Sequence, residues 1–155
     1  MLDFSNSKIL IVGDVMLDKY YFGKVDRISP EAPVPIVNIQ KEESRLGGAS
    51  NVANNIVSLG GHSLLCGVIG HDLFGKEIER ISRHKNIDPF LLKTSSPTIT
   101  KARIIGGKQQ IVRVDYEDKS ELNADNKKLF RDTISRILPE YDILVISDYG
   151  KGLIS

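Results

Sequence analysis

The fold of this chain is decided by residues 46–56, which read Leu-Gly-Gly-Ala-Ser-Asn-Val-Ala-Asn-Asn-Ile. After the pair Gly47-Gly48, apolar residues recur at helical spacing, and Gly60-Gly61 stands where a left-handed cap would end the helix. Glycines before a helix let backbone approach a ligand closely, and free N–H groups at the helix N-terminus point at it. Asn51 can project its amide toward the same place. The stretch therefore predicts either a polar small-molecule site or an exposed loop followed by a packed helix.

The rest of the chain alternates between strand-like and helix-like segments. Continuous apolar runs are typical of strands buried on both faces of a parallel sheet, and amphipathic segments with caps are typical of helices. Their order predicts an α/β fold with a doubly wound, mainly parallel sheet flanked by helices. Asp72 is expected to cap the helix that follows it. The strands are expected at 8–12, 63–69 and 143–146, and the further helices at 75–84 and 125–138.

Two acids follow the first strand. A dinucleotide-binding fold would place Gly-x-Gly-x-x-Gly here, but residues 13–18 read Gly-Asp-Val-Met-Leu-Asp. Carboxylates repel phosphate but accept hydrogen bonds from hydroxyl groups, so this crevice suits a sugar-like polyol better than a pyrophosphate. Asp14 and Asp18 are therefore candidate ligand residues, the alternative being turn formation or local capping.

Two segments depart from the strand–helix alternation. Residues 27–35 contain three prolines, so 20–40 is expected to be an excursion of short edge strands that covers a site or pairs with another subunit. Residues 97–105 and 109–115 predict a hairpin in which Lys101 and Arg103 share one face. These two cations could bind a phosphate together, although spacing alone favours a solvated face.

Composition excludes several function classes. The 21 basic and 20 acidic residues nearly balance, so no global field attracts nucleic acid or an anionic membrane. A single cysteine predicts a reducing cytoplasm, and neither a signal peptide nor a membrane-spanning run is recognisable. The three histidines lack a metal-ligand spacing. We expect a cytoplasmic domain, or part of one, without a metal site.

Several motifs together resemble a known family. Across essentially all 155 residues, the chain resembles the N-terminal half of a ribokinase-like (PfkB) sugar kinase, and within that family the heptose 7-phosphate kinases. The glycine pair with its asparagine is shared by the wider family, whereas the proline-rich motif and Ser-Asp-Tyr-x-Lys-Gly are more specific to the heptose branch. The motifs stand at 13–18, 27–35, 47–53, 98–101, 109–115 and 147–152.

The resemblance implies roles for particular residues. Segments at about 20–40 and 98–115 would form a β-lid of edge strands that closes over the sugar and often forms a homodimer interface, with Glu31 as a lid residue. Lys101 and Arg103 become candidates for the phosphate of the sugar. The substrate-binding residues implied are Asp14, Asp18, Gly47, Gly48, Asn51, Lys101, Arg103, Asp148 and Lys151.

The resemblance also implies a missing part. Family members carry a Gly-Ala-Gly-Asp-like motif whose aspartate is the catalytic base, in a C-terminal half that binds ATP, and this motif is absent here. We therefore expect residues 1–155 to be the sugar-binding half of an ATP- and Mg²⁺-dependent kinase that phosphorylates D-glycero-β-D-manno-heptose 7-phosphate at O1, for ADP-heptose and lipopolysaccharide synthesis. The chain alone would bind neither cofactor, contribute no catalytic residue, and be unstable or oligomeric.

Two alternatives stay open. The chain could belong to a kinase of the same family that acts on another sugar, although the lid motif argues against that. It could instead be a non-catalytic sugar-binding or dimerisation module that uses only the lid and the glycine-pair site.

Overall fold

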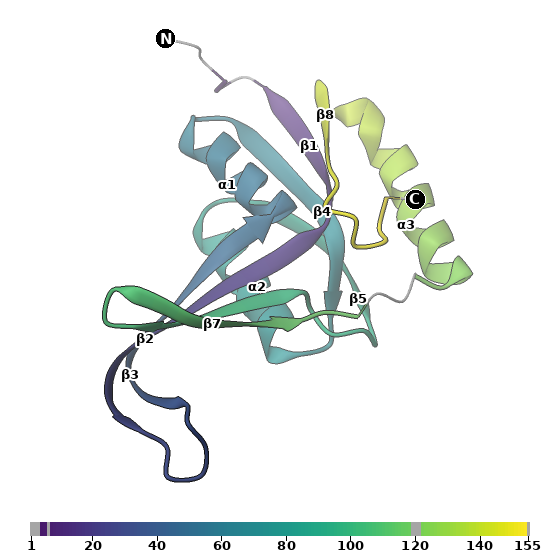
Figure 1. Cartoon of the computed structure of the whole chain (residues 1–155). Coiled ribbons are helices and arrows are strands. Elements are labelled where there is room, and N and C mark those ends of the chain that lie inside the picture. Colours follow the sequence, from purple (N-terminus) through teal and green to yellow (C-terminus); the bar gives the residue numbers. More distant parts are fainter. Residues whose placement is uncertain (1–3, 6, 119–121, 155) are drawn as a thin grey trace.

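A four-stranded parallel sheet forms the body of the molecule. The computed structural model describes residues 4, 5, 7–118 and 122–154. Helices α1 (Ala49–Ser58) and α2 (Leu73–His84) cover one face of the sheet and α3 (Ala124–Ile137) covers the other (Figure 1), which confirms the predicted doubly wound α/β architecture. The strands lie in the order β5 (Asp88–Thr94), β4 (His62–Gly70), β1 (Lys8–Gly13) and β8 (Ile143–Ser147).

The apolar run of β1 explains why this strand lies inside the sheet. Ile9 and Ile11 point toward α1 and α2, whereas Leu10 and Val12 pack with Phe130 of α3. All four β1 side chains are buried. A strand covered on both faces must be apolar at every position rather than at alternate ones, which is why the sequence shows a continuous run.

A second sheet extends from the carboxyl end of the first (Figure 1). Its order is β3 (Pro35–Gly48), β2 (Val15–Ile28), β6 (Thr100–Gly106) and β7 (Gln109–Tyr116). The pairs β2–β3 and β6–β7 are antiparallel, and β2–β6 is parallel. The chain passes through β4, α2 and β5 before it reaches β6. This long crossover connection allows β6 to pair in parallel with β2, so the sheet is mixed.

The prediction of short edge strands at 20–40 is wrong about their length and about β2, although β3 does lie at an edge of the sheet. The strands β2 and β3 are 14 residues each, and β2 lies between β3 and β6. The prolines do not interrupt them, because two lie in the loop at residues 29–34 and the third is the first residue of β3. Proline is tolerated at a strand's first residue. The polar residues 41–45 are also part of β3.

The ends of the helices follow the expected local chemistry. Gly60 has φ 88°, and Gly60 and Gly61 donate their N–H groups to the carbonyls of Val57 and Ile56, which confirms the left-handed cap at the end of α1. Asp72 accepts a hydrogen bond from Gly75 N at 2.8 Å and so caps α2 as predicted, with the helix starting at Leu73 rather than 75. None of the described helices is long and apolar enough to cross a membrane.

Candidate functional site

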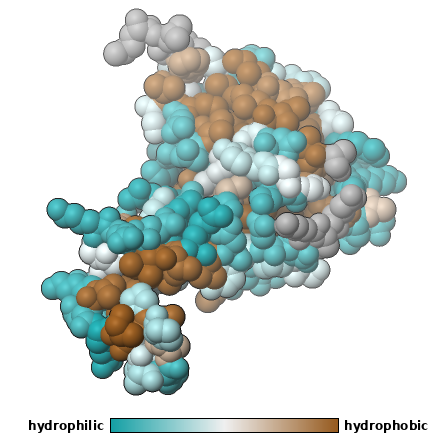
Figure 2. Space-filling view, in the orientation of Figure 1, coloured by the Kyte–Doolittle hydropathy of each residue, from teal (hydrophilic) through white to brown (hydrophobic). Residues whose placement is uncertain are grey.

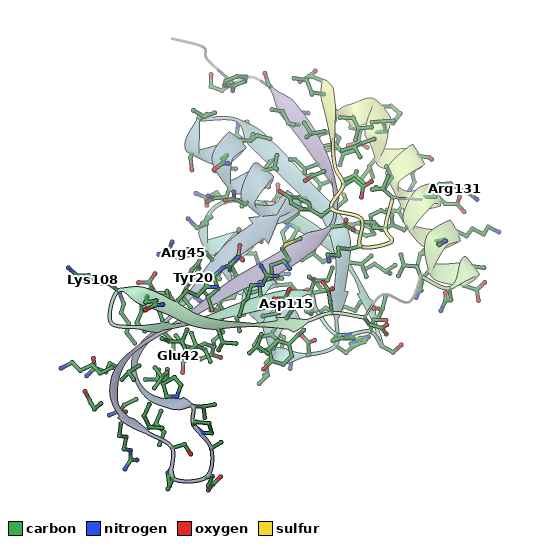
Figure 3. All side chains as sticks on the ribbon, viewed as in Figure 1. Tyr20, Glu42, Arg45, Lys108, Asp115 and Arg131 are labelled. Carbon is green, nitrogen blue, oxygen red and sulfur yellow. The ribbon has the colours of Figure 1, made fainter. Side chains whose placement is uncertain are left out.

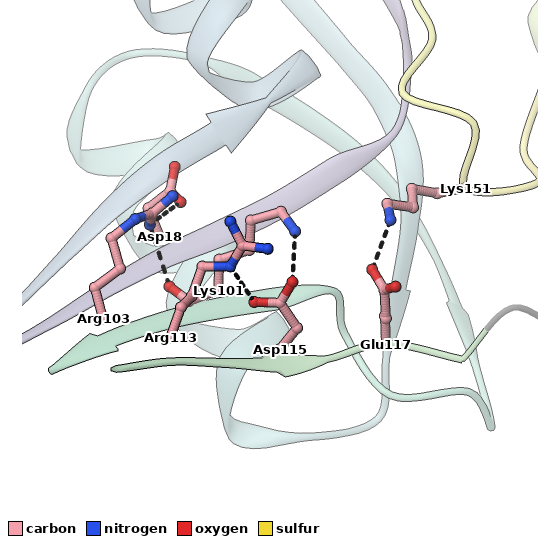
Figure 4. Close-up of polar contacts among 7 residues, drawn as sticks. All are labelled: Asp18, Lys101, Arg103, Arg113, Asp115, Glu117 and Lys151. Carbon is pink, nitrogen blue, oxygen red and sulfur yellow. Dashed lines mark hydrogen bonds and ion pairs between the residues drawn. The ribbon is translucent and has the colours of Figure 1, made fainter. Parts of the chain in front are cut away.

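A row of charged side chains runs along one face of the second sheet. The strand register places Asp18 of β2 beside Lys101 of β6, and Lys101 beside Asp115 of β7. Residues two apart on a strand point to the same face, so Arg103 and Arg113 join this row. Figure 4 shows the row continuing to Glu117 and Lys151, where it meets the carboxyl end of the first sheet.

The charges of the row are paired. Arg103 Nη1 donates to Asp18 Oδ1 at 2.5 Å, and both side chains are 22% exposed. Asp115 accepts from Lys101 Nζ at 3.0 Å and from Arg113 Nε at 2.8 Å. Lys151 Nζ donates to Glu117 Oε2 at 2.6 Å. The structure therefore brings together four residues predicted from the sequence, which are Asp18, Lys101, Arg103 and Lys151.

Pairing alters the acidity of these groups. Partial desolvation acts to raise the pKa of Asp115, but hydrogen bonds from Lys101 and Arg113 outweigh it and lower the pKa. The hydrogen bond from Lys151 lowers the pKa of Glu117. Partial burial disfavours the charged form of Arg103, yet its hydrogen bond to Asp18 and attraction to that carboxylate leave its pKa raised. Asp115 and Glu117 are therefore carboxylates and Arg103 is a charged guanidinium near neutral pH, which suits this row to binding hydroxyl and anionic groups.

The glycine pair lies against the acids because no side chain intervenes. A Cβ on Gly47 would stand 2.5 Å from Asp18 Oδ2 and 2.9 Å from Met16 Cγ. A Cβ on Gly48, which has φ 55°, would overlap the carbonyl oxygen of Asp14. At Gly48 any other residue would overlap backbone in a left-handed conformation, whereas at Gly47 a side chain would push the Asp18 carboxylate aside.

Asp14 lies at the junction of the two sheets. It is 3% exposed, and its Oδ2 accepts hydrogen bonds from the backbone N–H groups of Tyr149 and Lys151 at 2.8 and 3.1 Å. Its carbonyl oxygen accepts from Ala49 N at the start of α1, so this first helical N–H group is already paired. Asp14 therefore fixes the loop after β8 against the start of the glycine-pair helix.

Three other predicted residues lie away from the row. Asn51 is exposed on α1 and lines a groove beside β3, and Asp148 accepts from Gly150 N in an exposed turn. Glu31 lies in the loop at the far end of the β2–β3 hairpin. Ten strand residues separate Asp18 from the end of β2, so Glu31 is roughly 30 Å away.

Two hollows lie beside the row. A cleft of about 50 Å³ next to Asp14 and Lys151 has room for water but not for a sugar phosphate. A groove of about 420 Å³ along the β3 edge is lined by Glu43, Ser44, Arg45, Leu46, Asn51, Asn54 and Lys85. Within the described ranges, no three His, Cys, Asp or Glu side chains are grouped to hold a metal ion.

The two acids and the one arginine that complete the row were not predicted from the sequence. Asp115 and Glu117 hold the two lysines in place, and Arg113 supports Asp115. A usable signal was present, because alternation through 109–115 puts Arg113 and Asp115 on the face shared by Lys101 and Arg103. Arg45 and Tyr20 were also not singled out.

Comparison with known proteins identifies the class. Residues 6–151 match the pfkB family of carbohydrate kinases, and the chain belongs to this family. It is similar in structure to a possible 1-phosphofructokinase from Thermotoga maritima, with TM-score 0.70 and 20% identity, over 96% of this chain and 47% of that one. At this identity the likeness establishes the fold alone.

Two relatives share a larger part of the sequence. The chain is 46% identical over 151 residues to a D-beta-D-heptose 7-phosphate kinase of Bordetella bronchiseptica, covering 97% of this chain and 48% of that protein. It is also 46% identical over 148 residues to a bifunctional protein HldE of a Nitratiruptor species, covering 96% of this chain and 32% of that protein. The chain thus spans half or less of the length of these relatives.

Proposed function

We propose that residues 1–155 are the sugar-binding half of a kinase domain that phosphorylates D-glycero-β-D-manno-heptose 7-phosphate at O1 with ATP, for ADP-heptose and lipopolysaccharide synthesis in the cytoplasm. The observation that carries the proposal is that Asp18, Arg103 and Lys101 lie together beside the glycine pair. One surface then offers a carboxylate that accepts hydrogen bonds from sugar hydroxyls and two cations that can bind a phosphate. The similarity to a D-beta-D-heptose 7-phosphate kinase supports the choice of sugar.

In this proposal the site divides between the two ends of the ligand. Asp18 and Asn51 hold sugar hydroxyls above the backbone of Gly47 and Gly48, while Lys101 and Arg103 receive the 7-phosphate. The loop after β8, which contains Asp148 and Lys151, borders the sugar on the side of the first sheet. The pairing of the Asp18 carboxylate with the Arg103 guanidinium suits these roles, because the sugar phosphate can provide a substitute partner for each of them.

We place ATP, Mg²⁺ and the catalytic base in a complementary half outside residues 1–155, so that the chain alone has no kinase activity. The open edge of β8 supports this placement, because Ile143, Leu144 and Ile146 are exposed there although a parallel strand is normally covered on both faces. Apolar surface over this edge is visible in Figure 2. The complementary half would add strands and helices along β8.

We also propose that the second sheet is a β-lid, with Glu31 at its tip, and that it pairs with a second copy of the chain. Four apolar side chains near the tip are exposed, and Figure 2 shows apolar surface along this extension. They are Val25, Ile28, Val34 and Ile39. Sedimentation of the wild-type chain should show a dimer that Ile28→Asp dissociates, and a wild-type monomer at all concentrations would refute this assembly.

Equilibrium binding tests the function. Titration calorimetry should show that the purified chain binds heptose 7-phosphate more tightly than unphosphorylated heptose and does not bind ATP. Equal affinity for both sugars would favour the non-catalytic binding module, and a stronger preference for another sugar phosphate would favour a different kinase of the family. ATP-dependent phosphorylation of heptose 7-phosphate by this chain alone would overturn the placement of the catalytic machinery.

A further inference from the structure

One tyrosine on β2 lies beside two arginines. The guanidinium carbon of Arg45 is 4.7 Å from the centre of the Tyr20 ring, and that of Arg103 is 5.2 Å from it. The arginines come from the strands on either side, β3 and β6, so the ring is flanked from both directions. Figure 3 shows Tyr20 and Arg45 together where β2 and β3 leave the body of the molecule.

The ring gives both guanidinium groups an attractive contact. An aromatic face attracts a guanidinium because the ring carries negative charge density above its plane. Phe22 stacks on Tyr20, with ring centres 6.1 Å apart and an angle of 12°, and this fixes the orientation of the tyrosine. Tyr20 is therefore a platform that holds both guanidinium groups over the same face of the second sheet.

The acid beside Arg45 does not neutralise this surface. Glu43 Oε2 accepts from Arg45 Nη2 at 2.7 Å, but Glu43 Oε1 is also paired with Lys41 at 2.5 Å. Two basic side chains thus share one carboxylate, and Glu43 keeps a partner when Arg45 turns away. The Arg45 side chain is 59% exposed, so it can reorient without disturbing the core.

Arg45 also connects the row to the groove along β3. The groove of about 420 Å³ is lined by Arg45 together with Asn51, which the sequence predicts to bind the sugar. Pairing in the sheet sets Arg45 opposite Asp18. A ligand that contacts Asn51 and Asp18 therefore lies within reach of Arg45.

We propose that Arg45 is a second phosphate-binding residue, which acts with Arg103 over Tyr20 and sets the preference for a phosphorylated sugar. The inference rests on the proposed function and adds to it a residue from β3. Two guanidinium groups present planar forks of N–H donors that match the oxygens of one phosphate, which a lysine cannot reproduce. Tyr20 is a positioning residue, because it acts only through the two arginines.

The test compares two ligands on variants of the full chain. Arg45→Gln should weaken binding of heptose 7-phosphate roughly ten- to hundredfold, the size of one charge-assisted contact, and leave unphosphorylated heptose unchanged. Arg45→Lys should recover only part of the loss. Tyr20→Leu should reduce affinity for the phosphorylated sugar, whereas Tyr20→Phe, which keeps the aromatic face, should not.

The matched control is Arg80→Gln. Arg80 is 66% exposed and paired with Glu77 at 2.8 Å, as Arg45 is paired with Glu43, but it lies on α2. The role of Arg45 would be refuted if Arg45→Gln bound both sugars as Arg80→Gln does, or if it lost affinity for both sugars equally. Either result would leave the proposed function intact. A wild-type chain that binds neither sugar would refute both.

Discussion

Because Asp18 and Arg103 form an ion pair, replacing Asp18 should change the affinities for two ligands in opposite directions. If the sugar phosphate replaces this pair on binding, then Asp18 competes with phosphate for Arg103 while it helps to bind the sugar. Asp18→Asn should therefore raise the affinity of the chain for inorganic phosphate and lower its affinity for heptose 7-phosphate. If the ion pair had only a structural role, Asp18→Asn would not change the two affinities in opposite directions.

The size of the effect follows from the geometry. The contact of 2.5 Å joins side chains that are each 22% exposed, so its strength lies between that of a surface pair and that of a buried one, about 1–2 kcal/mol. Loss of that competition corresponds to roughly a tenfold gain in phosphate affinity. Calorimetric titration at fixed ionic strength measures both affinities.

The control removes an acid from an ion pair elsewhere. Asp132 lies 4.0 Å from Arg131 on α3, well away from the row (Figure 3), and Asp132→Asn should change neither affinity. Unchanged or weaker phosphate binding by Asp18→Asn would show that Asp18 does not compete with phosphate for Arg103. The proposal that the sugar phosphate replaces this ion pair on binding would then be wrong.

Three further predictions concern the fold around the site. Asp72→Ala removes the cap of α2 and the hydrogen bonds to Thr98, so the free energy of unfolding should fall by about 1–3 kcal/mol in denaturant titration, and an unchanged value would contradict the proposed contacts. Cys66 is buried, and desolvation raises the pKa of its thiol to about 12, so alkylation by iodoacetamide should require opening of the sheet; labelling as fast as that of a free thiol would contradict this. The pKa values of Asp115 and Glu117 lie below their ordinary values of 3.8 and 4.5, so their stabilising contribution is present above those values and is lost as pH falls through the lower folded pKa. The midpoint temperature of thermal unfolding should therefore fall as the pH is lowered from about 5 to about 3, which spans the ordinary carboxyl range, and should not fall between about pH 8 and about pH 6. A midpoint that does not depend on pH below about 5 would refute this contribution of Asp115 and Glu117.

Local signals in the sequence predicted the local parts of the fold. The apolar run at 8–12 identified a central strand because burial on both faces leaves no polar position. Gly60 marked the end of α1, and Asp72 the start of α2, because both act through hydrogen bonds to residues within four positions. The glycine pair was recognised for the same reason, since close approach of the backbone depends on the absence of a Cβ.

The rest of the site depends on contacts between distant parts of the chain. Arg103 is 85 residues from Asp18, and the loop after β8 is 135 residues from Asp14, so no local pattern links them. The length of β2 was missed because its second half is supported by pairing with β3 rather than by an apolar pattern of its own. Asp115 could have been assigned to the row from strand alternation, but its pairing with Lys101 required the register, and Glu117 lies beyond the end of β7.

We propose that the glycine pair and the row of charges form one binding surface for a sugar phosphate. Backbone amide shifts recorded by NMR while heptose 7-phosphate is titrated into the isotopically labelled chain test this proposal. The largest changes should occur at Asp18, Gly47, Gly48, Asn51 and Arg103, with little change on α3. Changes centred on α3 or on the edge of β8, with the glycine pair unaffected, would contradict it.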